Sequence, residues 1–208
     1  MDNIFGYKIS DSEYSQMKII ETPKFILRPV IFNDAKDLFE YLSQEKVVRY
    51  LPFKAHKNIY QTKNFINSFF IDNYKKGKVG NYAIYYKAYK KVIGNVGLNN
   101  VSTRASEAEI GICINPKYWG HNFATELTII SLITGFEILK LNKLIALTYT
   151  KNKYTPKSLE SLGFKYVKTY KPSSNADISH RFELTRNKYL ELKVNCLPNL
   201  LKEFKYNY

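Results

Sequence analysis

The segment best suited to bind a ligand or carry out chemistry joins an apolar strand to a helix, over residues 108–125. The strand AEIGICI (108–114) ends, the loop NPKYWGHNF follows, and a helical pattern begins near Ala124. The first turn of a helix has unpaired backbone N–H groups and a partial positive charge, so this junction is suited to hold a pyrophosphate. By its spacing alone, an ordinary strand-to-helix turn is the favoured interpretation.

The other reactive side chains form no recognisable catalytic set. Cys113 lies on the strand with no histidine near it in sequence, so we interpret it as a packing residue rather than a nucleophile. His56, His121 and His180 have neither triad nor metal-ligand spacing. Cys113 and Cys196 are far apart and form no CxxC pair, so neither a metal site nor a disulfide is predicted.

The periodicity around the junction predicts alternating strands and helices. Strands are expected at 25–30, 82–89, 92–98, 108–114, 144–149, 164–170 and 180–185, and helices at 124–140 and 157–162. Two earlier helices begin at Asn33 and Asn58 as N-caps, the second with Gln61 in a capping box. Strand 108–114 should direct Glu109, Gly111 and Cys113 to one face and its alanine and isoleucines to the other. This order predicts a mixed α/β (α+β) sheet with helices on both faces.

Three stretches carry a resemblance to a known family. EIGICINPKYWGHNFATE resembles the signature of the GNAT superfamily of acyltransferases, in the branch of the ribosomal-protein N-terminal acetyltransferases. NKYTPKSLESLGF (152–164) is similar to the family's Asn-x-x-Ser segment, and FILRPVIFNDAKDLFEYLSQEKVVRYLPF to the opening of that branch. The resemblance spans roughly residues 22–190. It implies the GNAT fold, a central mixed, mostly antiparallel sheet that splays at the acetyl-CoA site.

The resemblance implies acetyl-CoA as the cosubstrate. Its pantetheine would follow a sheet edge that opens beyond Ile114, paired with the backbone of Ile112 to Ile114, including Cys113. The residues expected around its pyrophosphate are Trp119, Gly120, His121, Asn122, Phe123, Ala124 and Thr125. Asn122 departs from the family pattern, which has glycine there, but asparagine readily adopts left-handed backbone angles.

The resemblance also implies direct transfer to a primary amine, which requires a base, positioning and stabilisation of an oxyanion. Glu109 is expected to be the base, directly or through a water, or else a structural carboxylate. Thr155 is expected near the departing sulfur as a hydrogen-bond donor, or as a helix N-cap, since Pro156 follows it. Asn152 would bond to pantetheine or orient the turn.

The composition restricts the number of domains, the location and the other kinds of protein that this chain could be. The 208 residues, 45% of them hydrophobic, predict one domain at 21–193 with an extension at 1–20 and a tail at 194–208. The apolar runs are shorter than the roughly 18 residues that a membrane span needs, and the start is unlike a signal peptide, so a cytoplasmic location is expected. The net charge of +14 is spread along the chain, unlike the concentrated charge of nucleic-acid binders.

The acceptor is the least determined partner. The resemblance favours a protein N-terminus, with a small amine or antibiotic as the alternative, and acceptor choice should reside in 53–81 and 168–180, which match least. The lysine-rich surface argues against a highly cationic acceptor. A catalytically weak acyl-CoA-binding or interaction module also remains open, because Asn122 replaces a glycine. A monomer or homodimer is expected.

Overall fold

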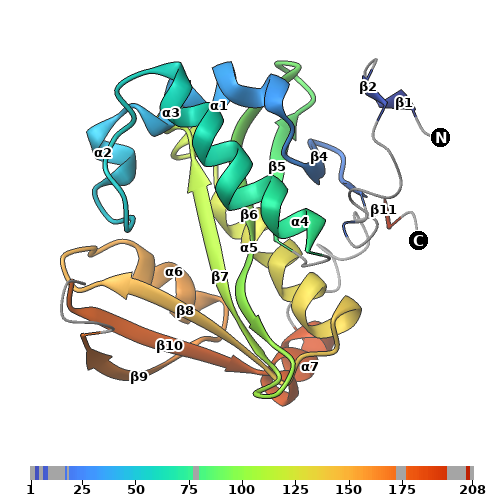
Figure 1. Ribbon diagram of the computed structural model, residues 1–208. Helices are drawn as coiled ribbons and strands as arrows, with labels where there is room; N and C mark the ends of the chain where they lie inside the picture. Colours follow the sequence, from blue (N-terminus) through green and yellow to red (C-terminus); the bar gives the residue numbers. More distant parts are fainter. Residues whose placement is uncertain are drawn as a thin grey trace.

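The computed structural model describes residues 3–4, 7–8, 17, 19–76, 80–171, 177–195 and 205–206; Cys196 lies outside them. Nine of the described strands form one sheet in the order β11-β3-β4-β5-β6-β7-β8-β10-β9 (Figure 1). Adjacent strands of this sheet are antiparallel, except for β7 and β8, which are parallel. The strands are β3 (Ile20–Glu21), β4 (Phe25–Pro29), β5 (Asn81–Tyr86), β6 (Lys91–Ser102), β7 (Glu107–Ile114), β8 (Lys143–Tyr149), β9 (Lys165–Tyr170), β10 (Ser179–Thr185) and β11 (Lys205–Tyr206). A separate pair joins β1 (Asn3–Ile4) to β2 (Tyr7–Lys8).

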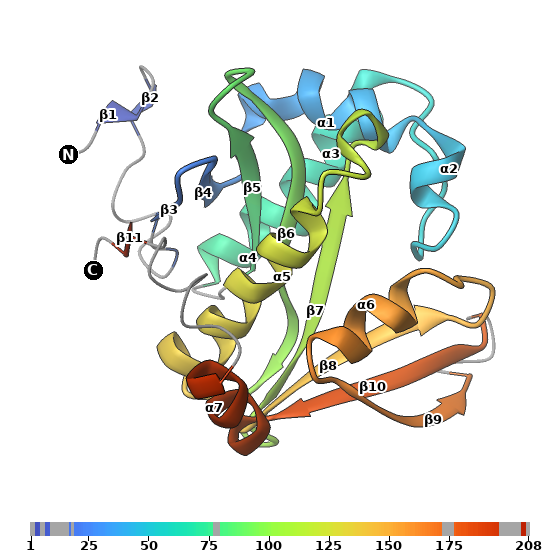
Figure 2. The same ribbon diagram turned by 180° about the vertical axis from the view of Figure 1, so that it is seen from behind.

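Helices cover both faces of the sheet, which confirms the predicted fold class. In Figure 1, α1, α3 and α4 lie across the near face, and Figure 2 shows α5 and α6 on the opposite face. The helices are α1 (Ala35–Leu42), α2 (Glu45–Val48), α3 (Ile59–Phe65), α4 (Asp72–Lys75), α5 (Phe123–Ile133), α6 (Thr155–Ser161) and α7 (Arg186–Asn195). A π-helical turn, Ile66–Ile71, joins α3 to α4, and another, Thr134–Ile138, extends α5. Among the described residues, no helix is both long and apolar enough to cross a membrane.

A buried ion pair determines where α1 begins. The guanidinium of Arg28 donates to both carboxylate oxygens of Asp34, at 2.8 and 2.7 Å, and both side chains are less than one-tenth exposed. Asp34 Oδ2 also accepts from the backbone N–H of Ile31 at 2.9 Å. The predicted N-cap at Asn33 is therefore wrong, because Asp34, fixed by Arg28, satisfies the backbone ahead of the helix and Asn33 is exposed.

The second predicted cap is confirmed. Asn58 Oδ1 accepts from Gln61 N at 3.0 Å, as an N-cap side chain should. The predicted capping box is corrected: Gln61 Oε1 accepts from Lys57 N at 2.6 Å, one residue before the cap, rather than from the N–H of Asn58. Helix α3 thus starts where its local sequence predicts, at the edge of the sheet face that carries Glu109.

The sheet splays between β7 and β8. These parallel strands pair only through Glu107–Lys143, Ala108–Leu144 and Glu109–Ile145, after which they separate (Figure 1). The expectation that the sheet opens beyond Ile114 is corrected: the opening begins after Glu109. The physical reason is that β8 pairs with β10 along all of its residues, 143–149, and so follows β10 and β9 away from β7.

Candidate active site

A pocket of roughly 370 Å³ opens at the N-terminus of α5 and reaches α6. It brings together most of the residues expected from the sequence around a pyrophosphate, together with one from the end of β7: Ile114, Trp119, Gly120, Asn122, Phe123, Ala124 and Thr125. Tyr118 and Ser158 line it too, although the sequence analysis does not single them out. A signal for Ser158 exists, since it follows Thr155 by three residues and so shares its helix face. His121 is not among the lining residues; it is exposed, and its ring stacks on Phe123 with centroids 5.4 Å apart.

The loop before α5 has the backbone of an anion cradle. Gly120 has φ 82°, and Asn122 has φ 60° and ψ 12°, both in the left-handed region. A Cβ added to Gly120 would meet no atom within 4 Å, so the space above the loop is open. The N-terminal amides of α5, an 11-residue helix, border this space together with the Thr125 hydroxyl. The arrangement fits a diphosphate chemically, because the donors and the helix dipole favour negative charge.

The open edge of β7 leads from this pocket towards Glu109. Asn115 N donates to Ile93 O of β6 at 2.8 Å, and the two strands are antiparallel. Because N–H and C=O groups alternate between the two edges of a strand, those of Ile112 and Ile114 face the opening. Trp119 Nε1 donates to the Ile114 carbonyl at 2.8 Å, so a ligand that uses this carbonyl either displaces the indole or shares the oxygen with it.

Cys113 directs its backbone away from that edge, so of the three residues expected to pair with pantetheine, Ile112 and Ile114 are the two whose N–H and C=O groups face it. The Cys113 carbonyl oxygen points to β6, where it would collide with a Cβ on Gly94. Its side chain lies on the same sheet face as Glu109, and burial raises the pKa of the thiol to about 12. The thiol therefore stays protonated at neutral pH, in agreement with its interpretation as a packing residue.

Glu109 stands at the point where β7 and β8 separate. Its carboxylate is half-buried and accepts from Asn100 Nδ2 at 3.2 Å. Burial raises the pKa of Glu109, while the Asn100 hydrogen bond and the positive charge of Arg181 partly offset that rise. A half-buried carboxylate with a raised pKa, at the point where two strands stop pairing, has the properties of a general base.

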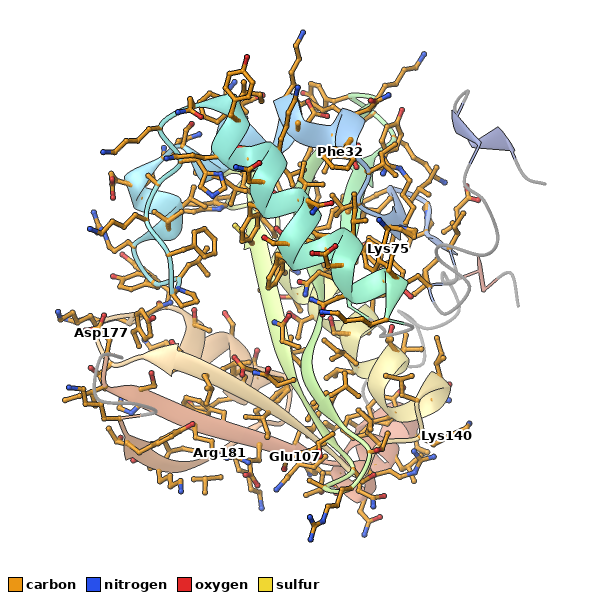
Figure 3. All side chains as sticks on the ribbon, in the orientation of Figure 1. Phe32, Lys75, Glu107, Lys140, Asp177 and Arg181 are labelled. Carbon is orange, nitrogen blue, oxygen red and sulfur yellow. The ribbon has the colours of Figure 1, made fainter. Side chains whose placement is uncertain are left out.

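An ion-pair cluster closes the sheet below Glu109. Lys143 Nζ lies 3.1 Å from Glu107 and 3.4 Å from Glu183. Arg181 lies 2.7 Å from Glu183 and 3.6 Å from Glu107. Figure 3 shows Glu107 and Arg181 at the foot of β7 and on β10. The cluster ties β7, β8 and β10 together at the end where they meet, so the strands separate only above it.

Asn152 and Thr155 organise the start of α6. Asn152 Oδ1 accepts from the backbone N–H groups of Tyr154 and Thr155 at 3.1 and 3.2 Å. Asn152 Nδ2 donates to Thr155 Oγ1 at 2.8 Å. Asn152 thus orients the turn, and the alternative role of Thr155 as N-cap is corrected, because Thr155 is the first helical residue and its oxygen already accepts from Asn152.

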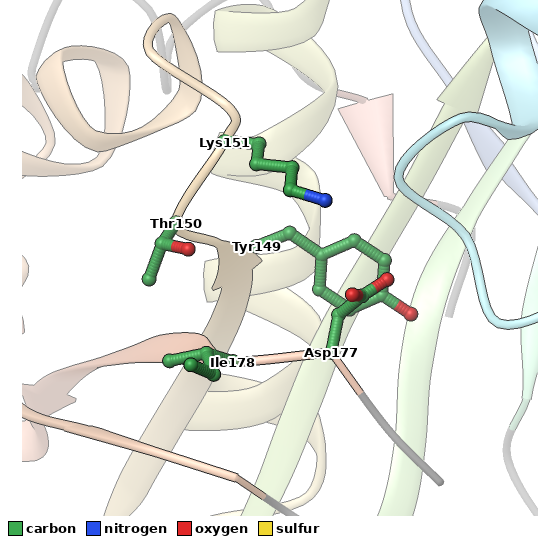
Figure 4. Close-up of a pocket in the computed structure, with 5 residues that line it drawn as sticks. All are labelled: Tyr149, Thr150, Lys151, Asp177 and Ile178. Carbon is green, nitrogen blue, oxygen red and sulfur yellow. The ribbon is translucent and has the colours of Figure 1, made fainter.

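A second pocket, of roughly 170 Å³, lies at the far end of β8 and is lined by Tyr149, Thr150, Lys151, Asp177 and Ile178 (Figure 4). Since Ile145 pairs with Glu109, side-chain alternation puts Tyr149 on the Glu109 face. Burial, and then the charge of Asp177, raise the pKa of the Tyr149 phenol.

The same pocket lies beside the other half of the sheet. Tyr50, which follows α2, donates through its hydroxyl to the Lys151 carbonyl at 3.3 Å across the opening. Asp177 and Ile178 belong to the segment 168–180 that was expected to choose the acceptor. The pocket therefore lies where the segment after α2 meets the far end of β8.

The splayed sheet, the cradle at α5 and the carboxylate beneath the opening define the class of protein. The family model described as "Acetyltransferase (GNAT) domain" matches residues 24–165, and the chain belongs to this family of N-acetyltransferases.

The proteins that this chain resembles include two whose names give different acceptors. YoaA, an uncharacterised N-acetyltransferase of Bacillus subtilis (strain 168), is 29% identical over 147 residues, which cover 71% of this chain and 82% of YoaA. The ribosomal-protein-S5-alanine acetyltransferase from Vibrio fischeri has a TM-score of 0.69 at 16% identity, covering 82% of this chain and 98% of that one. The spermidine N-acetyltransferase from Vibrio cholerae, in complex with CoA and spermine, has a TM-score of 0.69 at 20% identity, covering 80% and 98%. At these identities the two structures show the shared fold.

Proposed function

We propose that this protein transfers the acetyl group of acetyl-CoA to a primary amine, that residues 21–193 form the catalytic domain, and that the acceptor is a protein N-terminus. The observation that carries the proposal is the position of Glu109. A carboxylate with a raised pKa lies where β7 and β8 part, with the open edge of β7 leading from it to the α5 pocket.

The chain offers a continuous binding path for the cosubstrate. The N-terminal amides of α5 and the Thr125 hydroxyl would hold the diphosphate, and the open-edge backbone of Ile112 and Ile114 would pair with the amides of pantetheine. Acetyl-CoA, when bound, supplies the acetyl group as a thioester. The side chains of Glu109 and Thr155 are then needed only to move protons.

Two residues carry those protons. Glu109 accepts a proton from the acceptor ammonium, so that the amine nitrogen can form the new C–N bond directly while the C–S bond breaks. Thr155 accepts a hydrogen bond from Asn152 Nδ2, which leaves its own hydroxyl proton available for the departing sulfur. The second proton of the attacking nitrogen then replaces the one that Thr155 gives, so the products are the amide and the CoA thiol. No covalent enzyme intermediate is required, which agrees with the raised pKa of Cys113.

The resemblance to the ribosomal-protein branch supports a protein N-terminus as acceptor, and the charges in the pocket at the far end of β8 agree with it. Lys151 and Asp177 stand together in the pocket of Figure 4. Mixed charge suits a neutral or weakly charged acceptor better than a polyamine, which favours acidic walls. A peptide entering past this pocket would place its amine next to Glu109.

Calorimetric titration with acetyl-CoA, with free CoA as the comparison, tests the proposal. We expect micromolar binding, and the fluorescence of Trp119, the chain's one tryptophan, should change because its indole occupies the Ile114 carbonyl. Acetylation of alanine- and serine-terminated peptides should exceed that of spermidine. Absence of binding at millimolar ligand would instead indicate an interaction module with this fold.

Asn122→Gly is expected to preserve or tighten acetyl-CoA binding. Glycine adopts the observed φ of 60° without steric cost, so the stability of the fold should change by less than about 1 kcal/mol. Calorimetry and thermal unfolding measure the two quantities. A marked loss of affinity would show that the Asn122 side chain itself contacts the ligand.

A further inference from the structure

A directed chain of buried hydrogen bonds runs beneath α1. The hydroxyl of Tyr41 donates to Asn95 Oδ1 at 3.0 Å, and Asn95 Nδ2 lies 3.3 Å from Asn81 Oδ1. Asn81 Nδ2 then donates to Asn99 Oδ1 at 2.7 Å. Tyr74 of α4 anchors the middle of the chain, since its hydroxyl donates to the backbone carbonyl of Asn81. Four side chains from one helix and two strands are thereby fixed relative to one another.

Tyr41 determines the direction of this chain. Its side chain is 0% exposed, and burial holds the pKa of the phenol well above its ordinary value, so the hydroxyl keeps its proton and needs an acceptor. Each asparagine then accepts through its oxygen and donates through its nitrogen. Asn99, the last member, accepts through Oδ1, which leaves its Nδ2 over Gly111, and within the described residues this amide nitrogen donates to no acceptor.

The Asn99 amide lies on the same sheet face as the proposed base. Asn99 on β6 is the register partner of Glu109 on β7, so both side chains occupy the same sheet face. Asn99 Nδ2 passes over Gly111, where an added Cβ would come within 2.5 Å of it. The half-buried Asn99 thus presents its amide nitrogen above Gly111, on the sheet face that carries Glu109 two residues earlier on β7.

We propose that Asn99 is a specificity-determining residue, whose amide donates a hydrogen bond to the carbonyl oxygen next to the amine that is acetylated. This inference rests on the proposed function and deepens it. In a protein N-terminus that carbonyl is two bonds from the amine, so one molecule meets Glu109 with its ammonium and Asn99 with its oxygen. A polyamine has no such acceptor and would leave the amide of the half-buried Asn99 unpaired beneath it, which costs binding energy.

A matched pair of acceptors tests the proposal. Alaninamide contains the carbonyl, and sec-butylamine has a similar branched skeleton without it. In the Asn99→Ala variant, kcat/KM for alaninamide should fall roughly 10- to 100-fold, while that for sec-butylamine should change less than about twofold. Asn99→Asp, which replaces the donor by an acceptor of the same shape, should show at least the same loss of selectivity. Calorimetric affinity for acetyl-CoA should be unchanged in both variants.

Tyr41→Phe tests the directing role of the chain. It keeps the ring and removes only the donor, so Asn99 can reorient and part of the alaninamide selectivity should be lost. Tyr60→Phe, on an exposed tyrosine of α3, is the control and should retain it. If the Asn99 variants lose activity towards both acceptors equally, Asn99 has only a structural role and the inference is overturned. If the wild-type protein acetylates no amine, the proposed function fails first, and this inference fails with it.

Discussion

Replacing Glu109 by glutamine is expected to lower kcat/KM by roughly 10²- to 10⁴-fold, the usual contribution of a positioned general base. Glutamine keeps the shape of the side chain and its hydrogen bond to Asn100 but cannot accept the proton. Affinity for acetyl-CoA should change less than about twofold, because Glu109 faces the acceptor side of the sheet. Steady-state kinetics with a peptide acceptor, together with calorimetry, measure both effects.

The pH dependence provides a second measure of the same assignment. Only the ionised carboxylate can accept a proton, so kcat/KM should rise with pH through the pKa of Glu109. Burial raises that pKa, so this limb should lie above the ordinary carboxyl range, and it should be absent from Glu109→Gln. Glu191→Gln, on the exposed side of α7, should behave as wild type. Wild-type turnover of Glu109→Gln across the pH range would assign Glu109 a structural role.

Ala124→Glu is expected to weaken acetyl-CoA binding by roughly 30- to 1,000-fold without unfolding the protein. Ala124 is exposed in the first turn of α5 and lines the pocket. A carboxylate there adds about 0.3–1 kcal/mol of favourable interaction with the helix dipole. It also repels a nearby diphosphate by about 2–4 kcal/mol at the effective dielectric of a protein surface. Binding and stability should therefore change in opposite directions.

The matched control for that variant is Ala124→Gln, which has the same length and no charge. If charge is responsible, the glutamine variant should retain most of the affinity in calorimetry, and the thermal midpoint of the glutamate variant should be unchanged or slightly higher. Equal weakening by both residues would indicate steric exclusion. Unchanged binding in both would place the diphosphate elsewhere.

The sequence by itself determined the elements and the α5 pocket, because the relevant signals act over a few residues. Asn58 caps its helix through Gln61, three residues away. The pocket is built largely from the contiguous run Ile114 to Thr125, so a strand end, a turn and a helix start bring most of its lining together, and among the described residues Ser158 of α6 is its one distant member.

The tertiary structure decided which way individual backbone and side-chain groups point and where β7 and β8 begin to separate. Cys113 turns its carbonyl to β6 because of the register between the two strands, and Asp34 replaces Asn33 ahead of α1 because Arg28 reaches it from β4. The splay begins after Glu109 because β8 follows β10. None of these partners is determined by residue type.

The contacts on the sheet face proposed to bind the acceptor were also decided by the tertiary structure. Tyr41 and Asn95 are 54 positions apart, Asn95 and Asn81 are 14 apart, and Asn81 and Asn99 are 18 apart. Tyr149 and Asp177 meet only because β8 pairs with β10. Local propensity selects helices and strands, but hydrogen bonds between segments far apart in the chain depend on sheet register and helix packing, which exist only once the whole domain has folded.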